Sequence, residues 1–160
     1  MKKSGKKWII VVDKFLYMLI GKYQNTMDAK RRLPMPAKLR DVLGKTVVIT
    51  RGLEQCLFVY PMNTWTDFAD KINKLPMSQA SARSFARLIF SGAMEVELDA
   101  LGRALIPDYL KEHAQLGKEV IIIGAGSRLE LWDKAKWEKY QSSEVEDMGE
   151  SITGLKEFGI

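Results

Sequence analysis

The chain has 160 residues, of which 46% are hydrophobic, and a formal net charge of +5. These values fit one compact domain or two small intertwined ones, and they exclude collagen-like and wholly disordered chains. The positive charge favours an anionic partner, because Lys and Arg release condensed counterions when they neutralise phosphates. The chain has a single cysteine, Cys56, which excludes an intrachain disulfide and a zinc site built from cysteines alone. A chain without disulfides is compatible with a reducing cytosol.

Residues 1–17 are predicted to be an extension ahead of the folded part. Four lysines within the first seven residues precede an apolar stretch, as in a signal peptide, but Asp13 and Lys14 interrupt that stretch. No small-x-small cleavage pattern follows, and the apolar runs are too short to span a bilayer. We therefore expect no membrane segment here and take Met18 as a candidate natural start.

The chain repeats itself at a distance of about 71 to 73 residues. TMDAKRRLPMP at 26–36 matches ELDALGRALIP at 97–107, with Asp, Ala, Arg and Pro in register. Aromatic residues also recur at matched positions, which predicts core packing rather than a base-stacking platform: Phe58, Tyr60, Trp65, Trp132 and Trp137. A match of this length indicates two tandem copies of one supersecondary unit.

Each repeat is predicted to contain a short strand, a turn with the pattern Asp-x-x-x-Arg, and a second strand ending near proline. A short helix then begins at Pro36-Ala37 or Pro107-Asp108, because proline is tolerated in the first helical turn. Two apolar strands follow, Thr46 to Arg51 and Cys56 to Tyr60 in the first repeat, Val120 to Gly124 and Leu129 to Trp132 in the second.

Longer helices are predicted from Thr64 to Leu75 and from Ser78 to Phe90, the latter with apolar residues at helical spacing. Arg83 and Arg87 on this second helix fit either salt bridges to neighbouring copies or a solvated face. A shorter helix is expected around Trp137. From Ser142 the chain becomes acidic with few apolar residues, which predicts a poorly ordered, solubilising tail.

The predicted organisation is an extension at 1–17, a first repeat at 18–75, a connecting amphipathic helix at 76–91, a second repeat at 92–141 and an acidic tail at 142–160. So few strands in each repeat would leave sheet edges exposed, and interleaving the repeats around a pseudo-twofold axis would remove those edges. The expected fold class is α+β, mainly β, with a compact barrel formed inside one chain and short flanking helices.

The two Asp-x-x-x-Arg turns are the candidate functional sites. Their carboxylates, Asp28 and Asp99, can accept N–H bonds within the turn while an arginine is held at the rim. A turn cap with an ion pair is the plainer interpretation. The first repeat nevertheless gathers five positive side chains between residues 28 and 40: Lys30, Arg31, Arg32, Lys38 and Arg40. Arginine suits phosphate oxygens and guanine edges because its planar fork donates parallel hydrogen bonds.

The chain offers little to an enzyme or a metal site. His113 is the only histidine, so one chain builds no His-based cluster, and we expect this residue to face solvent. Asp28 and Asp99 could hold Mg²⁺ for phosphodiester hydrolysis if the fold brought them together. No third carboxylate or general base recurs, and no phosphate-cradling glycine loop is present. We predict no enzymatic activity and no cofactor.

Several stretches resemble the MraZ family of bacterial transcriptional regulators. MLIGKYQNTMDAK at 18–30 resembles the opening of these proteins, and TRGLEQCLFVYP at 50–61 agrees with them as well. ARSFAR at 82–87, FSGA at 90–93 and the pattern Asp-x-x-Gly-Arg-x-x-Ile-Pro at 99–107 complete the resemblance. It extends from Met18 to about Tyr140.

The resemblance implies an AbrB-like swapped-hairpin double domain that assembles into ring-shaped homo-oligomers. It also implies a cytoplasmic, nucleoid-associated regulator that binds double-stranded DNA at short direct repeats upstream of the division and cell-wall gene cluster, often repressing its own operon. DNA contacts would then fall to Arg32 first and Arg103 second. Lys30, Arg31, Lys38 and Arg40 would assist, while Asp28, Asp99 and Gly102 would shape the turns.

The sequence departs from the family pattern at Arg31, where a glycine usually stands and where the second repeat has Gly102. If that position needs positive φ, arginine incurs a backbone cost, and we expect the turn to survive with altered DNA preference. Pro34 also replaces the usual apolar residue. Two other functions stay open: an AbrB-type antitoxin whose main partner is a toxin, and a protein-interaction ring that reads no DNA.

Overall fold

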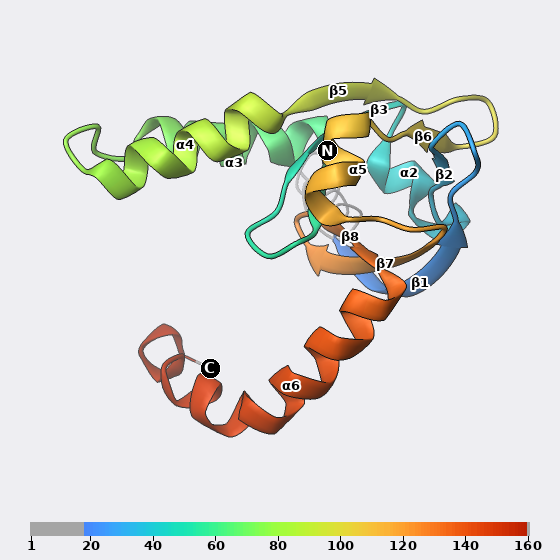
Figure 1. Ribbon diagram of the computed structural model, residues 1–160. Coiled ribbons are helices and arrows are strands. Elements are labelled where there is room, and N and C mark those ends of the chain that lie inside the picture. The colour runs from blue at the N-terminus through green and yellow to red at the C-terminus, as the bar shows by residue number, and fades with distance from the viewer. Residues whose placement is uncertain (1–17, 160) are drawn as a thin grey trace, which may run out of the picture.

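The computed structural model describes residues 18–159, so the predicted extension at 1–17 lies outside the described residues. The strands are β1 (Leu19–Thr26), β2 (Arg32–Pro34), β3 (Thr46–Arg51), β4 (Leu57–Pro61), β5 (Met94–Glu97), β6 (Arg103–Leu105), β7 (Glu119–Gly126) and β8 (Leu129–Asp133). The helices are η1 (Ala37–Leu39), α2 (Arg40–Leu43), α3 (Met62–Asn73), α4 (Ala80–Gly92), α5 (Asp108–Ala114), α6 (Lys134–Thr153) and η2 (Lys156–Phe158). Figure 1 shows their arrangement.

Six of these strands form one antiparallel sheet in the order β1-β7-β8-β4-β3-β5, and β2 pairs with β6 in a separate two-stranded ribbon. Strands from the two halves of the chain pair with each other at four places: β1 with β7, β2 with β6, β3 with β5 and β4 with β8. The predicted α+β, mainly β class is confirmed, and the main sheet is antiparallel. Neither half of the chain has a complete sheet of its own.

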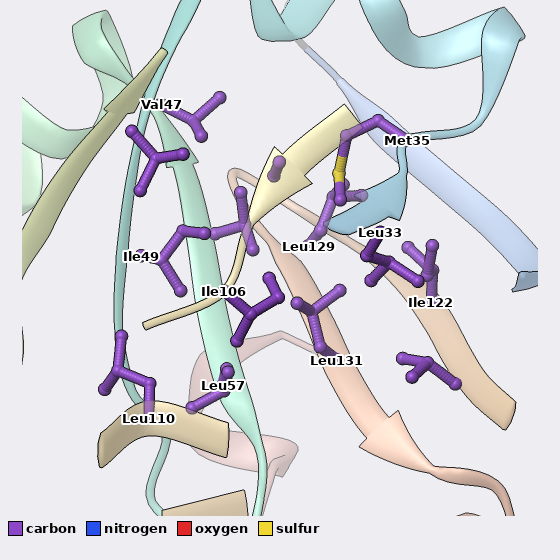
Figure 2. Packing of buried hydrophobic residues seen from close by; sticks show 14 of the residues in the cluster. Leu33, Met35, Val47, Ile49, Leu57, Ile106, Leu110, Ile122, Leu129 and Leu131 are labelled. Carbon is purple, nitrogen blue, oxygen red and sulfur yellow. The ribbon is translucent and has the colours of Figure 1, made fainter. Parts of the chain in front are cut away.

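The central strands are apolar on both faces because both faces are covered. In β3 and β4, Val47, Ile49 and Val59 belong to the main core, whereas Phe58 and Tyr60 belong to a second cluster on the opposite face. This alternation follows from the two-residue period of a strand. Figure 2 shows how Leu33, Met35, Ile106 and Leu110 point into the main core toward Ile49, Leu57, Leu129 and Leu131.

The second cluster is aromatic, as the repeated aromatic positions predict. Tyr60 stacks on Phe68 of α3 with ring centroids 5.0 Å apart, and Trp132 meets Trp137 of α6 at 5.4 Å. Offset and edge-on aromatic pairs of this kind stabilise a fold beyond the area they bury. The aromatic residues at matched positions therefore anchor α3 and α6 to the same face of the sheet.

The C-terminal part differs from its predicted form. Residues 142–153 belong to the long helix α6 instead of a poorly ordered tail, and α6 exceeds the short helix expected around Trp137. Asp133 caps this helix by accepting a hydrogen bond from the backbone N–H of Lys136, and Trp137 and Tyr140 anchor its first turns on Trp132. None of the helices in residues 18–159 is long and apolar enough to cross a membrane.

His113 also lies differently from the expectation that it faces solvent. The residue is half-buried, and its Nε2 atom is enclosed without a hydrogen-bond partner among the described residues. Its neighbours Leu110 and Ala114 on α5 are fully buried. The helix therefore sits deeper against the sheet than its polar sequence indicates.

Truncating Ile122 to alanine tests the packing of the main core. Ile122 has no exposed surface, so Ile122→Ala removes contacts on all sides and should lower the free energy of unfolding by about 2–5 kcal/mol. Urea denaturation at fixed protein concentration measures the loss. Ile20, on the neighbouring strand and 63% exposed, is the control. Equal losses for Ile20→Ala and Ile122→Ala would contradict this core.

Candidate nucleic-acid interface

The first Asp-x-x-x-Arg turn is built around one carboxylate. The backbone N–H groups of Lys30 and Arg32 each donate to Asp28 Oδ1 at 2.9 Å. Arg32 Nε donates to the other oxygen, Oδ2, at 2.7 Å. The backbone N–H of Arg31 closes the turn by donating to the Asp28 carbonyl at 3.0 Å. Asp28 therefore fixes both the backbone of the turn and the direction of the Arg32 side chain.

The second turn repeats this geometry almost atom for atom. Asp99 Oδ1 accepts from the N–H groups of Leu101 at 3.0 Å and Arg103 at 2.9 Å, and Oδ2 accepts from Arg103 Nε at 2.7 Å. In both turns, hydrogen bonds from the backbone N–H of the arginine hold the pKa of the aspartate below its usual value of 3.8. Both carboxylates are consequently ionised at neutral pH.

Each arginine keeps most of its hydrogen-bonding capacity free. The carboxylate engages Nε, while the N–H groups on the Nη atoms of Arg32 and Arg103 have no protein partner among residues 18–159. About 36% of the Arg32 side chain and 25% of the Arg103 side chain are exposed. The Nη edge of a guanidinium is the part that can donate two parallel bonds to a phosphate or to guanine.

The β2–β6 ribbon places both arginines on one face. Its register pairs Leu33 with Ala104, Arg32 with Leu105 and Arg103 with Pro34. Leu33 and Ala104 are completely buried, so the flanking positions of each strand point to the opposite, outward side. Arg32 and Arg103 are thus related by the pseudo-twofold axis of the ribbon and face away from the core together.

The turns are also joined to each other through backbone hydrogen bonds. Ile106 N–H donates to the Arg31 carbonyl at 2.8 Å, and Met35 N–H donates to the Gly102 carbonyl at 2.9 Å. Arg31 and Gly102 occupy equivalent positions, with φ of 63° and 74°. Position 31 therefore does need a positive φ. Arginine incurs the backbone cost in the first turn, whereas glycine avoids this cost in the second.

The guanidinium groups of Arg31 and Arg40 have structural tasks that the sequence did not predict. Arg31 Nε donates to the Ile106 carbonyl at 3.0 Å, and Arg40 Nε donates to the equivalent Met35 carbonyl at 3.1 Å. A Cβ atom at Gly102 would collide with the Arg40 guanidinium. Arg40 therefore fills beside the second turn the place that the side chain of Arg31 fills beside the first.

The remaining predicted residues surround the ribbon. Lys30 and Lys38 are exposed, and Lys38 lines, with Arg40, an open groove of about 450 Å³ between β1 and the segment after β2. Asn25, which the repeat pattern did not single out, lies in this groove and donates to the Pro34 carbonyl at 2.7 Å. The signal in the sequence that could have indicated Asn25 is its polar side chain on a strand next to the turn.

Two exposed leucines complete the ribbon surface. Leu105, opposite Arg32, is 49% exposed, and Leu101 at the tip of the second turn is 63% exposed. The sequence pattern did not distinguish them from core residues, because only the register shows which face they occupy. Apolar contacts of this kind can recognise the methyl group of thymine.

In the described residues, no group of three His, Cys, Asp or Glu side chains could hold a metal ion.

Adding one methyl group at Gly102 tests the join between the turns. Gly102→Ala should destabilise the protein by about 1–2 kcal/mol from the positive φ alone, and by more because of the collision with Arg40. Gly126, with φ of 85° and open space around it, is the matched control for the backbone cost. Urea denaturation of both variants should give the larger loss for Gly102→Ala, and Arg40→Ala added to it should recover part of the difference. Equal losses would contradict the Arg40 contact.

Acidification tests the aspartates. Because the folded-state pKa of Asp28 and Asp99 lies below the ordinary 3.8, these groups stabilise the fold above that value, and the contribution is lost as the pH falls through the folded pKa. From about pH 5 downward, the thermal midpoint of the wild type should fall more steeply than that of Asp28→Asn/Asp99→Asn. Parallel curves in calorimetry would exclude these carboxylates as the source.

Comparison with known proteins identifies the family of this chain. The sequence model of the MraZ protein family, whose description also likens it to antitoxins, matches residues 18–88 and again residues 89–151. The transcriptional regulator MraZ of Clostridium beijerinckii is 50% identical over 143 residues, covering 89% of this chain and 100% of the relative. The same regulator of Heliobacterium modesticaldum is 46% identical over the same coverage, and that of Moorella thermoacetica is 47% identical over 84% of this chain and 94% of its own. The chain belongs to the MraZ family.

Proposed function

We propose that this protein is a sequence-specific DNA-binding transcriptional regulator that recognises DNA with its two Asp-x-x-x-Arg turns. The observation that carries the proposal is the outward face of the β2–β6 ribbon, on which two carboxylate-held arginines are presented together. The naming of its relatives as transcriptional regulators supports the same function. Its targets would be direct repeats upstream of the division and cell-wall gene cluster, with repression of its own operon as the expected effect.

The geometry suits recognition because the arginines are ordered before DNA arrives. Asp28 and Asp99 hold the guanidinium groups through Nε, so binding orders fewer side-chain rotamers at the interface. The Nη groups can then contact guanine edges or phosphates, while Lys30 and Lys38 add phosphate contacts. Leu105 would contact thymine methyl groups. We therefore assign the sequence-specific part of the binding free energy to the ribbon, and the salt-dependent part to the lysines around it.

The crossed pairing of the two halves supports an AbrB-like swapped-hairpin double domain, in which one chain supplies both turns. The repeat boundaries at 18–75 and 92–141 stay predictions. One pair of turns is a small surface, so we expect it to bind weakly. In a ring-shaped homo-oligomer at the nucleoid, several copies would engage successive DNA repeats, and avidity would supply the useful affinity.

An antitoxin with a protein toxin as its main partner is the second candidate, favoured by the antitoxin likeness in the description of the family. The two functions differ in what they require of the turns. DNA recognition needs the Nη groups of Arg32 and Arg103 and weakens with salt. Neutralisation of a toxin needs neither property. Tight binding to a protein without salt-sensitive DNA binding would favour the antitoxin.

Removal of Arg32 tests the DNA-binding proposal. Fluorescence anisotropy with DNA from upstream of the protein's own gene, across a salt series, should show selective binding that weakens as salt rises. Arg32→Ala should lower the affinity by roughly 5- to 150-fold per site, because a bidentate contact is lost. Lys139→Ala removes an equal charge from an exposed position on α6 and should change little. Failure of the wild type to prefer this DNA over random DNA would contradict the proposal.

A further inference from the structure

Helix α6 and the short helix η2 after it carry exposed apolar side chains beyond the folded body. Trp137 and Tyr140 pack against Trp132, with ring centroids 5.4 Å and 4.8 Å from it. Further along come four large apolar side chains, here called the tail stripe: two lie one helical turn apart on α6, and two lie just beyond its end, before and in η2. Its members are Met148 (45% exposed), Ile152 (45%), Leu155 (39%) and Phe158 (70%).

Nothing in the described part of the chain covers the tail stripe. Figure 1 shows α6 leaving the body after β8 and carrying the C-terminus well away from α3 and α4. A helical segment of a few turns that packs against nothing is marginally stable in water, and packing of its apolar side chains is what usually stabilises it. Several exposed large apolar side chains on one segment are also typical of an interaction surface. The tail stripe is therefore suited to packing against another surface.

An apolar groove of about 280 Å³ lies between α3 and α4. The α3–α4 groove is lined by apolar side chains, among them Ile72, Leu75, Met77 and Phe90, and by Arg83 and Arg87. Two of its apolar side chains are strongly accessible, Leu75 at 38% and Met77 at 80%. Its floor between two helices is suited to the apolar face of a third helix, which would be a helix-in-groove contact.

The charges of the two surfaces are complementary. Arg83 and Arg87 stand one helical turn apart on the wall of the groove, and neither makes an ion pair with a side chain that the structure describes. The Arg83 guanidinium donates to the Met77 carbonyl, at 2.8 Å. The segment around the tail stripe is acidic, with Glu144, Glu146, Asp147, Glu150 and Glu157. An acidic, apolar segment and a basic, apolar groove attract each other, whereas two acidic segments or two basic grooves repel each other.

We propose that the tail stripe of one copy docks in the α3–α4 groove of a second copy of this chain. The occupant is a second copy because α6 carries its own tail stripe away from its own groove. The contact joins two different surfaces, so it is heterologous and leaves each copy with one free tail and one free groove. Repetition of such a contact gives a closed ring or a filament. The inference goes beyond DNA recognition and uses no residue of the turns.

Cross-linking between two variants tests this contact. One full-length copy carries Met77→Cys in the groove, and a second, size-tagged copy carries Phe158→Cys in the tail stripe. Native Cys56 is completely buried, so wild-type protein gives the background of a short bismaleimide linker. Leu101→Cys, 63% exposed at the second turn, replaces Met77→Cys as the matched control. The mixed-size product should exceed this control by roughly five-fold or more, the ratio given by about 1 kcal/mol of preference.

Charge reversal provides the second readout. Arg87→Glu in the groove copy should lower the yield by about two- to five-fold, and Asp147→Lys in the tail copy should restore it, as expected for exposed opposite charges. Circular dichroism checks that each variant folds. A yield no higher than that of the Leu101→Cys control would overturn the proposal. So would a product formed only within single chains when Met77→Cys and Phe158→Cys are placed together, because the groove would then hold its own tail.

Discussion

The antiparallel pairing of β2 with β6 is the constraint on which the candidate interface depends. Each strand has only three residues, so their mutual hydrogen bonds alone are a weak support. Burial of Leu33 and Ala104 anchors the ribbon to the core, and the reciprocal bonds from Ile106 to Arg31 and from Met35 to Gly102 tie the turns together. Because the pairing joins the two halves of the chain, one polypeptide presents both turns on one face.

The turns combine two demands that oppose each other. A surface for nucleic acid gains from positive charge, yet each turn places a carboxylate beside its arginine. The aspartate accepts two backbone N–H bonds and one from Nε, and this holds the guanidinium in one orientation with its Nη edge outward. The carboxylate therefore reduces the positive charge of each turn, but it fixes the orientation of the guanidinium. Lys30 and Lys38 restore the positive field around the ribbon without taking part in the turn.

Much of the fold and the candidate site could be predicted because the patterns that indicate them lie within short stretches of sequence. The repeated Asp-x-x-x-Arg pattern and the proline-started helices indicated the turns and short helices, and apolar runs indicated β3, β4, β7 and β8. The strand order and the outward position of Leu105 depend on pairing between distant segments, which local pattern does not encode. Arg40 could not be assigned to the second turn, since its contact spans 62 residues to Gly102. The helical tail was missed because composition hides the spacing of Met148 and Ile152.

A double-mutant cycle of Asp28 and Arg32, measured by selective DNA binding, shows whether the aspartate acts by orienting the arginine. Asn at position 28 can still accept the two backbone N–H bonds, but it no longer pairs with Arg32 Nε, and the net charge of the protein becomes more positive. If charge alone governed binding, Asp28→Asn would tighten the complex. Asp28→Asn should instead weaken selective binding, and it should cause no further loss when Arg32→Ala is already present, because Asp28 acts through Arg32. Tighter binding by Asp28→Asn, or losses that simply add, would show that Asp28 does not act by orienting Arg32.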